Sequence, residues 1–316
     1  MERRDTILAE NREYWTGRAP GYSEVNKLEL ATAQRQRWED CLREELARQF
    51  PARPLADLQV LEVGTGPGFF AILLRELGCA VTAIDLTPAM LAEAKENAGK
   101  LADEICFLEM DAEALTFADG SFDAVISRNL TWNLPHPDKA YAQWARVLRP
   151  GGLLLDFDAN WYAYLFDAEA QAAYDRDRAN SAQQGVWDQN VEAEGEDFDV
   201  MEDIARRVPL SGIRRPAWDL EQLSSLGLRA EADEQVWQRV WSDEEKVSFA
   251  STPLFLVRGK KRPFQAPSRP PLEEQPSGAH PADRTSVDAH GGISEERGEG
   301  RPLPCSLHRS RQIGIL

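Results

Sequence analysis

The segment that decides the fold is residues 58–70, which read LQVLEVGTGPGFF. Its apolar run ends at Glu62, and three alternate glycines follow at positions 64, 66 and 68. Apolar residues then recur at helical spacing, at Phe70, Leu73, Leu74 and Leu77. A strand, a glycine turn and a helix in this order form the nucleotide-binding unit of doubly wound α/β folds. We therefore expect a ligand to be held at this turn.

The spacing of the glycines distinguishes between two kinds of nucleotide ligand. The dinucleotide fingerprint is G-x-G-x-x-G, whereas this chain has E-x-G-x-G-x-G and places Phe69 where the third glycine would stand. No pyrophosphate need lie on the helix, so the bend suits an uncharged edge such as a ribose with an amino-acid tail. In these residues the chain resembles the class I S-adenosylmethionine-dependent methyltransferases, in particular the bacterial type 11 small-molecule group. The resemblance covers roughly residues 10–260.

The resemblance implies S-adenosyl-L-methionine as co-substrate and a role for the end of each strand. The glycine turn would pass the amino-acid part of this molecule, and the carboxylate of Asp111 would meet the adenine amine. Asn129 and Leu130 would lie beside the methyl donor. The co-substrate-binding residues that it implies are Glu62, Gly64, Thr65, Gly66, Gly68, Asp85, Leu86, Asp111, Ala112, Asn129, Leu130 and Tyr22.

Asp85 ends the apolar segment AVTAID, 23 residues after Glu62. A carboxylate at this place can accept hydrogen bonds from both ribose hydroxyls, which a neutral side chain cannot match. An acid about 20 residues past a glycine loop also suits NAD, so Asp85 alone does not separate the two ligands. The structural alternative is an acid at the start of the helix that Thr87 and Pro88 predict.

Apolar segments alternate with amphipathic ones along residues 58–157. They predict strands near 58–63, 80–84, 105–109, 122–127 and 152–157, and helices near 68–77, 88–98 and 137–148. Further on, residues 219–226 predict a helix, and 228–237 and 253–258 predict strands. The alternation predicts a mostly parallel sheet with helices on both faces. With the antiparallel final pair that the resemblance implies, we expect a Rossmann-like, doubly wound α/β fold with a seven-stranded sheet.

We divide the chain into five parts on composition. They are an N-terminal lid and helix (1–54), a co-substrate-binding core (55–157), an acceptor-side insertion (158–217), the end of the sheet (218–261) and a tail (262–316). In the first part, aromatic residues surround a Gly-Arg-Ala-Pro-Gly turn, and residues 25–50 predict a helix that ends before Pro51. The resemblance implies that Tyr14, Trp15 and Tyr22 fold over the co-substrate as a lid. The alternative is that they anchor the first helix.

The insertion and the tail differ from the core in composition. Residues 158–217 carry thirteen acidic and six basic residues and many aromatics, and we expect a helical and aromatic lid there that sets acceptor specificity. Residues 262–316 contain eight prolines and six glycines with little apolar content. Such a composition cannot bury enough apolar surface to fold, so it predicts a disordered tail.

The net charge of the 316-residue chain, −17, argues against nucleic acid as a partner. The tail holds seven basic and seven acidic residues, so the charge falls on residues 1–261. The four cysteines lie far apart, and no apolar run approaches membrane-spanning length. The simplest interpretation is a cytoplasmic protein without a membrane partner. Only His136 among the four histidines precedes the tail, which argues against a histidine-built metal site.

Candidates for contact with the methyl acceptor follow the fourth and fifth strands. Trp132, Asn133 and His136 come after the fourth strand, and Asp158, Asn160 and Trp161 come after the fifth. If the acceptor must lose a proton, His136 or Asp158 is the candidate base; the alternative for His136 is a solvated turn. Arg214 and Arg215 could clamp an acceptor carboxylate, or they could form a solvated charge run.

The reaction that these residues predict is direct in-line methyl transfer to a small molecule. A sulfonium is a good leaving group, so orientation of the two reactants supplies most of the catalysis, about 7–11 kcal/mol. Two alternatives stay open on sequence alone. One is an NAD-dependent oxidoreductase on a similar sheet, and the other is a non-catalytic protein that binds S-adenosylmethionine as a sensor or partner subunit. The sequence carries no signal of an oligomeric state.

Overall fold

The computed structural model describes residues 2–186 and 198–263, and its centre is a seven-stranded sheet with the strand order β3-β2-β1-β4-β5-β7-β6. Five neighbouring strands are parallel, and β7 runs antiparallel to both β5 and β6. The expected doubly wound, mostly parallel sheet is confirmed. The strands are β1 (Gln59–Val63), β2 (Ala80–Asp85), β3 (Ile105–Glu109), β4 (Phe122–Arg128), β5 (Leu148–Asp158), β6 (Leu228–Asp233) and β7 (Phe255–Lys261).

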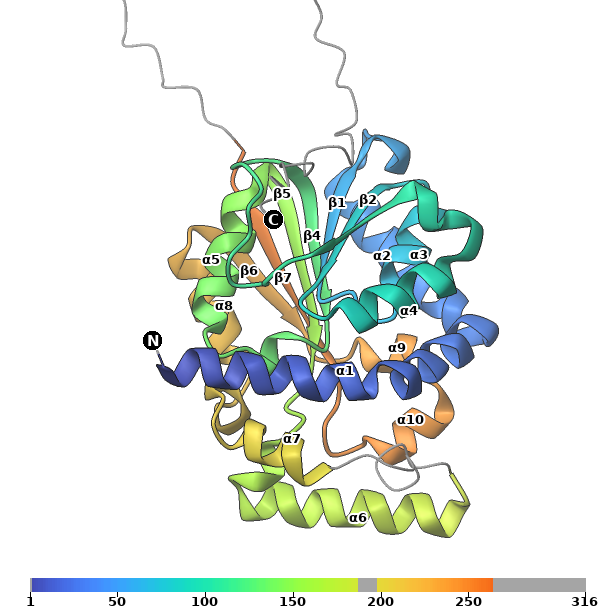
Figure 1. Cartoon of the computed structure of the whole chain (residues 1–316), viewed down its shortest axis with the longest axis vertical. Coiled ribbons are helices and arrows are strands. Elements are labelled where there is room, and N and C mark those ends of the chain that lie inside the picture. Colours follow the sequence, from blue (N-terminus) through green and yellow to red (C-terminus); the bar gives the residue numbers. More distant parts are fainter. Residues whose placement is uncertain (1, 187–197, 264–316) are drawn as a thin grey trace, which may run out of the picture. The chain divides into compact units, whose positions relative to one another are not determined.

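Helices pack on both faces of the sheet because its central strands are buried on both sides. Trp38, Leu42 and Phe70 belong to one core cluster, on the face covered by α2 (Ala33–Gln49), α3 (Phe69–Glu76) and α9 (Trp237–Val240). Tyr141 and Trp144 belong to the other, under α5 (Pro137–Val147) and α8 (Ala217–Ser225). Figure 1 shows α5 and α8 on one side of the strands and α2 and α3 on the other.

The N-terminal part differs from its prediction. Residues Glu2–Ala31 form one helix, α1, which continues through Pro20 in place of the expected turn. The predicted helix over 25–50 is instead divided at Thr32, whose side chain caps α2 by accepting from the Gln34 amide. Helix α1 packs against α2 and against α4 (Pro88–Ala98). It runs across the lower end of the strands in Figure 1. Tertiary packing thus keeps a proline inside this helix.

Two boundaries in the second half of the sheet also shift. Strand β5 begins at Leu148, directly after α5, and not at the predicted residue 152. The Pro-Gly-Gly sequence at 150–152 is an irregularity within the strand, between the pairs Phe122–Leu148 and Ala124–Leu153. Strand β6 ends at Asp233, short of the predicted residue 237. The Asp233 carboxylate accepts from the Gln235 amide at 2.9 Å, a side-chain turn that stops the strand.

The insertion contributes helices α6 (Ala168–Gln184) and α7 (Phe198–Ala205), and α10 (Asp243–Ser248) packs against α6. Buried residues of α7 form a small core with Ile7 of α1 and with Trp132, which follows β4. The predicted disordered tail, apart from its first two residues, lies outside the described residues. Within the described ranges, no helix is long and apolar enough to cross a membrane.

Candidate functional site

The glycine loop between β1 and α3 needs glycine because its backbone enters the left-handed region. Gly64, Gly66 and Gly68 have φ values of 70°, 52° and 91°. A Cβ on Gly68 would lie 3.0 Å from the Cβ of Ala94 in α4, so this glycine allows close helix packing. A Cβ on Gly66 would be 3.6 Å from the nearest ring atom of Tyr22, at the wall of a cavity. The loop therefore leaves space for a ligand where a side chain would stand.

Carboxylates occupy the ends of the first three strands. The Asp85 carboxylate accepts from the amides of Gly66 and Thr87, each at 2.9 Å, and burial raises its pKa. Glu62 accepts from the Thr65 hydroxyl at 2.6 Å, and burial raises its pKa to about 8. Asp111 accepts from the amide of Glu113 at 2.8 Å. Each carboxylate oxygen has two lone pairs, so Asp85 keeps acceptor capacity for a ligand.

These strand ends surround one hollow, which we call the first cavity. Of the twelve co-substrate-binding residues that the sequence predicts, eleven line it, and Gly68 does not. The eleven are Tyr22, Glu62, Gly64, Thr65, Gly66, Asp85, Leu86, Asp111, Ala112, Asn129 and Leu130. A bend free of side chains, a carboxylate beside it and apolar side chains across from them fit the ribose, tail and base of S-adenosylmethionine.

Helix α1 closes the first cavity. The sequence predicted aromatic residues of this segment over the co-substrate, but it did not predict one continuous helix or the other residues of it that line the cavity. Leu8, Asn11, Arg12, Trp15 and Asn26 line it from this helix. The Asn11 amide group donates to the carbonyl oxygen of Asn133 at 3.0 Å, which ties α1 to the segment after β4. The signal was present as a spacing of three or four residues between positions 8, 11, 12 and 15, but the Gly-Arg-Ala-Pro-Gly sequence was interpreted as a turn.

A second hollow adjoins the first, and we call it the aromatic cavity. Trp15, Tyr22, Arg128 and Asn129 line both. Its other walls come from the insertion, from α2 and from the region around α10. Rings line it on most sides: Tyr14, Trp15, Tyr22, Trp38, Trp132, Trp161, Tyr162, Tyr164, Tyr174, Trp241 and Phe249.

The residue at the junction of the two cavities, Asn129, has a strained backbone. It directly follows β4 and has a φ of 55°, the one positive value of a residue other than glycine within the described ranges. Its carbonyl oxygen accepts from the Trp132 indole at 3.1 Å. A strained residue held by its surroundings is common at ligand sites, and Asn129 was among the predicted residues.

Neither candidate base lies in a cavity wall. His136 begins α5, and its backbone amide donates to the Glu113 carboxylate at 2.7 Å; its side chain lines neither the first nor the aromatic cavity. Asp158 is fully buried and accepts from the Trp132 amide at 2.9 Å and from the Trp161 indole at 3.0 Å. The geometry therefore supports a structural role for Asp158, and we retain neither residue as a base.

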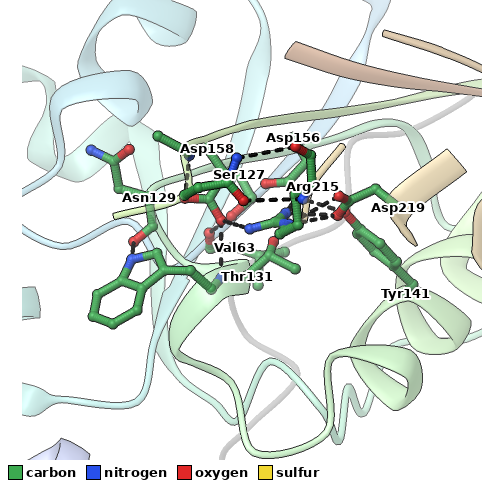
Figure 2. Close-up of polar contacts among 12 residues, drawn as sticks. Val63, Ser127, Asn129, Thr131, Tyr141, Asp156, Asp158, Arg215 and Asp219 are labelled. Carbon is green, nitrogen blue, oxygen red and sulfur yellow. Dashed lines mark hydrogen bonds and ion pairs between the residues drawn. The ribbon is translucent and has the colours of Figure 1, made fainter. Parts of the chain in front are cut away.

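Asp158 belongs to a buried charge cluster around Arg215 (Figure 2). The guanidinium of Arg215 pairs with Asp158 and, at 3.2 Å and 2.7 Å, with Asp156 and Asp219. Burial raises the pKa values of Asp156 and Asp158, and the positive charge of Arg215 opposes that shift. Both expectations for Arg215, an acceptor clamp or a solvated run, are wrong; only its neighbour Arg214 is exposed.

Tyr141 and Thr131 complete this cluster. The Tyr141 hydroxyl lies 2.7 Å from Asp156 and 2.6 Å from Asp219, and the Thr131 hydroxyl donates to Asp156 at 2.6 Å. The cluster thereby joins β5, α5, α8 and the short helix Thr131–Asn133. It fixes the segment that carries Asn129 and Trp132 into the cavities. No group of three metal-ligating side chains occurs in the described part of the chain.

Comparison with known proteins gives one family match. Residues 61–156 match the model of a methyltransferase domain, a segment that holds the glycine loop and the ends of β1 to β4. A demethylmenaquinone methyltransferase from Thermus thermophilus is 37% identical over 139 residues, 43% of this chain and 60% of the relative. A malonyl-[acyl-carrier protein] O-methyltransferase from Enterobacter lignolyticus is 35% identical over 136 residues, 43% and 48% of the two chains.

The chain thus spans about half the length of these curated relatives. A solved S-adenosylmethionine-dependent methyltransferase from Aquifex aeolicus aligns over 69% of this chain and 88% of its own length. Its sequence identity is 18% and the TM-score is 0.42.

Proposed function

We propose that the chain is a class I S-adenosylmethionine-dependent methyltransferase that transfers a methyl group in line to a nucleophilic atom of a small molecule. The match of residues 61–156 to a methyltransferase domain supports this class. The observation that carries the proposal is the joining of the glycine loop and three strand-end carboxylates around one cavity. The names of the relatives, which act on demethylmenaquinone and on a malonyl carrier protein, support a small acceptor group. The aromatic cavity supports the same conclusion by its size, about 280 Å³.

When bound, S-adenosyl-L-methionine supplies a methyl group on a sulfonium that leaves as a neutral thioether. We propose that Asp85 accepts from the ribose hydroxyls and that Gly64 and Gly66 admit the tail. Asp111 and Ala112 would face the base, with Leu86 and Met110 packing on its rings. The nucleophile forms a bond to the methyl carbon as the carbon–sulfur bond breaks, and any proton on the nucleophile leaves to solvent. An acceptor that is already ionised needs no base, which agrees with a cavity wall that lacks His136 and Asp158.

Helix α1 has the proposed role of excluding water. Trp15 and Tyr22 lie in the walls of both cavities, so they separate the proposed reaction centre from solvent on that side. We also propose that the protein works in the cytoplasm; the wide spacing of the four cysteines along the sequence supports this location.

A comparison of one variant with one ligand analogue tests the proposed hydrogen bond between Asp85 and the ribose. We expect Asp85→Asn to weaken S-adenosylhomocysteine binding by tenfold to a hundredfold, because a charge-assisted hydrogen bond is worth about 1.5–3 kcal/mol. The 2′-deoxy analogue separates this bond from a disturbed loop: wild type should prefer the 2′-hydroxyl, and the variant should not. Calorimetry measures both affinities, with exposed Asp103→Asn as control.

Equal affinity of wild type and Asp85→Asn would contradict the proposal. Transfer of a labelled methyl group into a cell extract then separates an enzyme from a non-catalytic binding protein. Binding of NADH in place of S-adenosylhomocysteine would favour the oxidoreductase alternative, against which the position of Phe69 and the family match both argue.

A further inference from the structure

We propose that the aromatic cavity binds the methyl acceptor, and that this acceptor is a planar aromatic molecule with an acidic oxygen. The inference rests on the proposed methyl transfer and deepens it. A volume of about 280 Å³ stands at the lower end of small-molecule sites, which span about 300–1,000 Å³. It suits a molecule of one or two rings that carries a carboxylate or a phenolate.

The position of the aromatic cavity is the first argument. In-line transfer needs the nucleophile about 3–3.5 Å from the methyl carbon, so the acceptor site must adjoin the donor site. The aromatic cavity shares four lining residues with the first cavity. A third hollow, near Thr32 and Gly185, shares none with it. Among these three hollows of the described residues, only the aromatic cavity can present a nucleophile to the first.

The shape of its walls is the second argument. Tyr164 and Tyr174 stack with ring centroids 4.2 Å apart and planes 18° apart. Trp132 and Tyr162 lie with centroids 4.8 Å apart. Such rings offer flat apolar faces, which favour a planar ring over an extended aliphatic chain.

Two buried donors without partners are the third argument, and they point to an oxygen on the ligand. Arg128 donates from Nη2 to both carboxylate oxygens of Glu29, at 2.8 and 2.9 Å, but its Nη1 has no hydrogen-bond partner among the described residues. The indole nitrogen of Trp38 also lacks one there, although Trp38 is only 1% exposed. The guanidinium carbon lies 5.1 Å from the Trp38 ring centroid. Each unpaired buried donor costs about 1–3 kcal/mol, and a ligand oxygen would remove that cost.

The carboxylates of this wall already have donors. Glu29 is held by Arg128, and Glu202 accepts from the Tyr164 hydroxyl at 2.9 Å and from Arg206. Glu245 accepts from the Ser242 amide at 2.7 Å and from Gln34.

The same wall also holds the guanidinium groups of Arg18 and Arg178. Aromatic walls alone would suit an ammonium ligand, but this ligand would meet three guanidinium groups. Three carboxylates balance these charges, but they already accept hydrogen bonds, whereas Nη1 of Arg128 and the Trp38 indole have no partner among the described residues. The donors that remain therefore favour an anionic acceptor.

Calorimetry on protein saturated with S-adenosylhomocysteine tests the inference with three probes of one shape. These are 2-naphthoate, 2-naphthamide and 2-naphthylmethylammonium. We expect naphthoate to bind at least tenfold more tightly than the amide, and the ammonium ion to bind more weakly than either. Tighter binding of the ammonium ion, or no binding of naphthoate, would overturn the inference. Failure of S-adenosylhomocysteine itself to bind would overturn the proposed function instead.

Two variants locate the oxygen. Trp38→Phe keeps a ring and removes the N–H, and we expect it to weaken naphthoate about fivefold. The double variant Arg128→Met with Glu29→Gln removes the cation without leaving a buried charge. We expect Glu29→Gln alone to bind naphthoate more tightly than naphthamide, and the double variant to bind the two equally. The double variant could instead weaken the binding of S-adenosylhomocysteine, but not of 5′-methylthioadenosine, which lacks the amino-acid tail, and leave naphthoate binding unchanged. Arg128 would then hold the tail carboxylate, and the inference would be wrong. The wild-type probe series decides even if a variant does not fold.

Discussion

The first cavity and the aromatic cavity meet at four residues, but they are built in opposite ways. In the first cavity, backbone bends and carboxylates at the ends of neighbouring strands form one side, and apolar side chains together with helix α1 form the rest. The aromatic cavity consists of large rings from α1, α2, the insertion and the region of α10, segments far apart in the sequence. The sheet fixes the positions of the strand ends, whereas the rings are placed only when separate helices pack together.

The two cavities therefore differ in how far their shape depends on the helices outside the sheet. Parallel strands bring their carboxyl ends to one edge whatever the connecting helices are. The aromatic walls depend on the insertion after β5 and on α1, so changes there alter the acceptor site and leave the strand ends in place. The Arg215 cluster is where the two systems join, because Asp158 of β5 holds the Trp132 amide and the Trp161 indole.

The largest effect should follow from removing Arg215 from this cluster. We expect Arg215→Met to lower the free energy of unfolding by about 3–5 kcal/mol, because it leaves three buried carboxylates without their cation. Urea denaturation measures the loss, which should shrink at low pH because Asp156 and Asp158, whose pKa values are raised by burial, become protonated. Arg214→Met is the matched control: this neighbour is exposed, and its effect should stay within about 0.5 kcal/mol. Equal stabilities for the two variants would show that the cluster does not join the two regions.

A smaller effect should fall on the first cavity alone. We expect Gly66→Val to weaken S-adenosylhomocysteine about a hundredfold, about 2.7 kcal/mol, because valine resists a φ of 52° and its side chain enters the cavity. Gly99→Val is the control, since Gly99 has a φ of 54° with no atom near its Cβ position. Calorimetry gives the affinities, and thermal unfolding shows that the backbone strain is similar. If both variants bind equally, the loop does not face the ligand.

A third effect concerns pH and develops gradually. The pKa of Glu62 is raised to about 8 by burial, so the stability gained from its neutral form is complete below its ordinary pKa and is lost as pH rises toward 8. Relative to Glu62→Gln, wild type should lose up to about 1.4 kcal/mol per pH unit over this window. Urea denaturation at pH 5, 6.5 and 8 measures the trend. Exposed Glu104→Gln should show no such trend, and a flat difference for Glu62→Gln would place its carboxylate in a solvated site.

The strands and the residues at their ends could be predicted because both depend on short-range patterns. The apolar run before Glu62, the acid at Asp85 and the turn at Thr87-Pro88 needed no knowledge of distant segments. Helix α1 could not be predicted in the same way, because Pro20 disfavours a helix and only packing against α4 and α2 keeps it. The role of Arg215 was not predicted because a pair of arginines in an acidic segment is usually solvated. Two of its three carboxylate partners, Asp158 and Asp156, lie 57 and 59 residues away in the sequence.

Helix α1 is one continuous helix that places Trp15 and Tyr22 in the walls of both cavities. A displacement of this helix would change the walls of both cavities at the same time. On the proposed assignment of donor and acceptor to the two cavities, we therefore expect a shift of this helix to affect the exchange of both molecules.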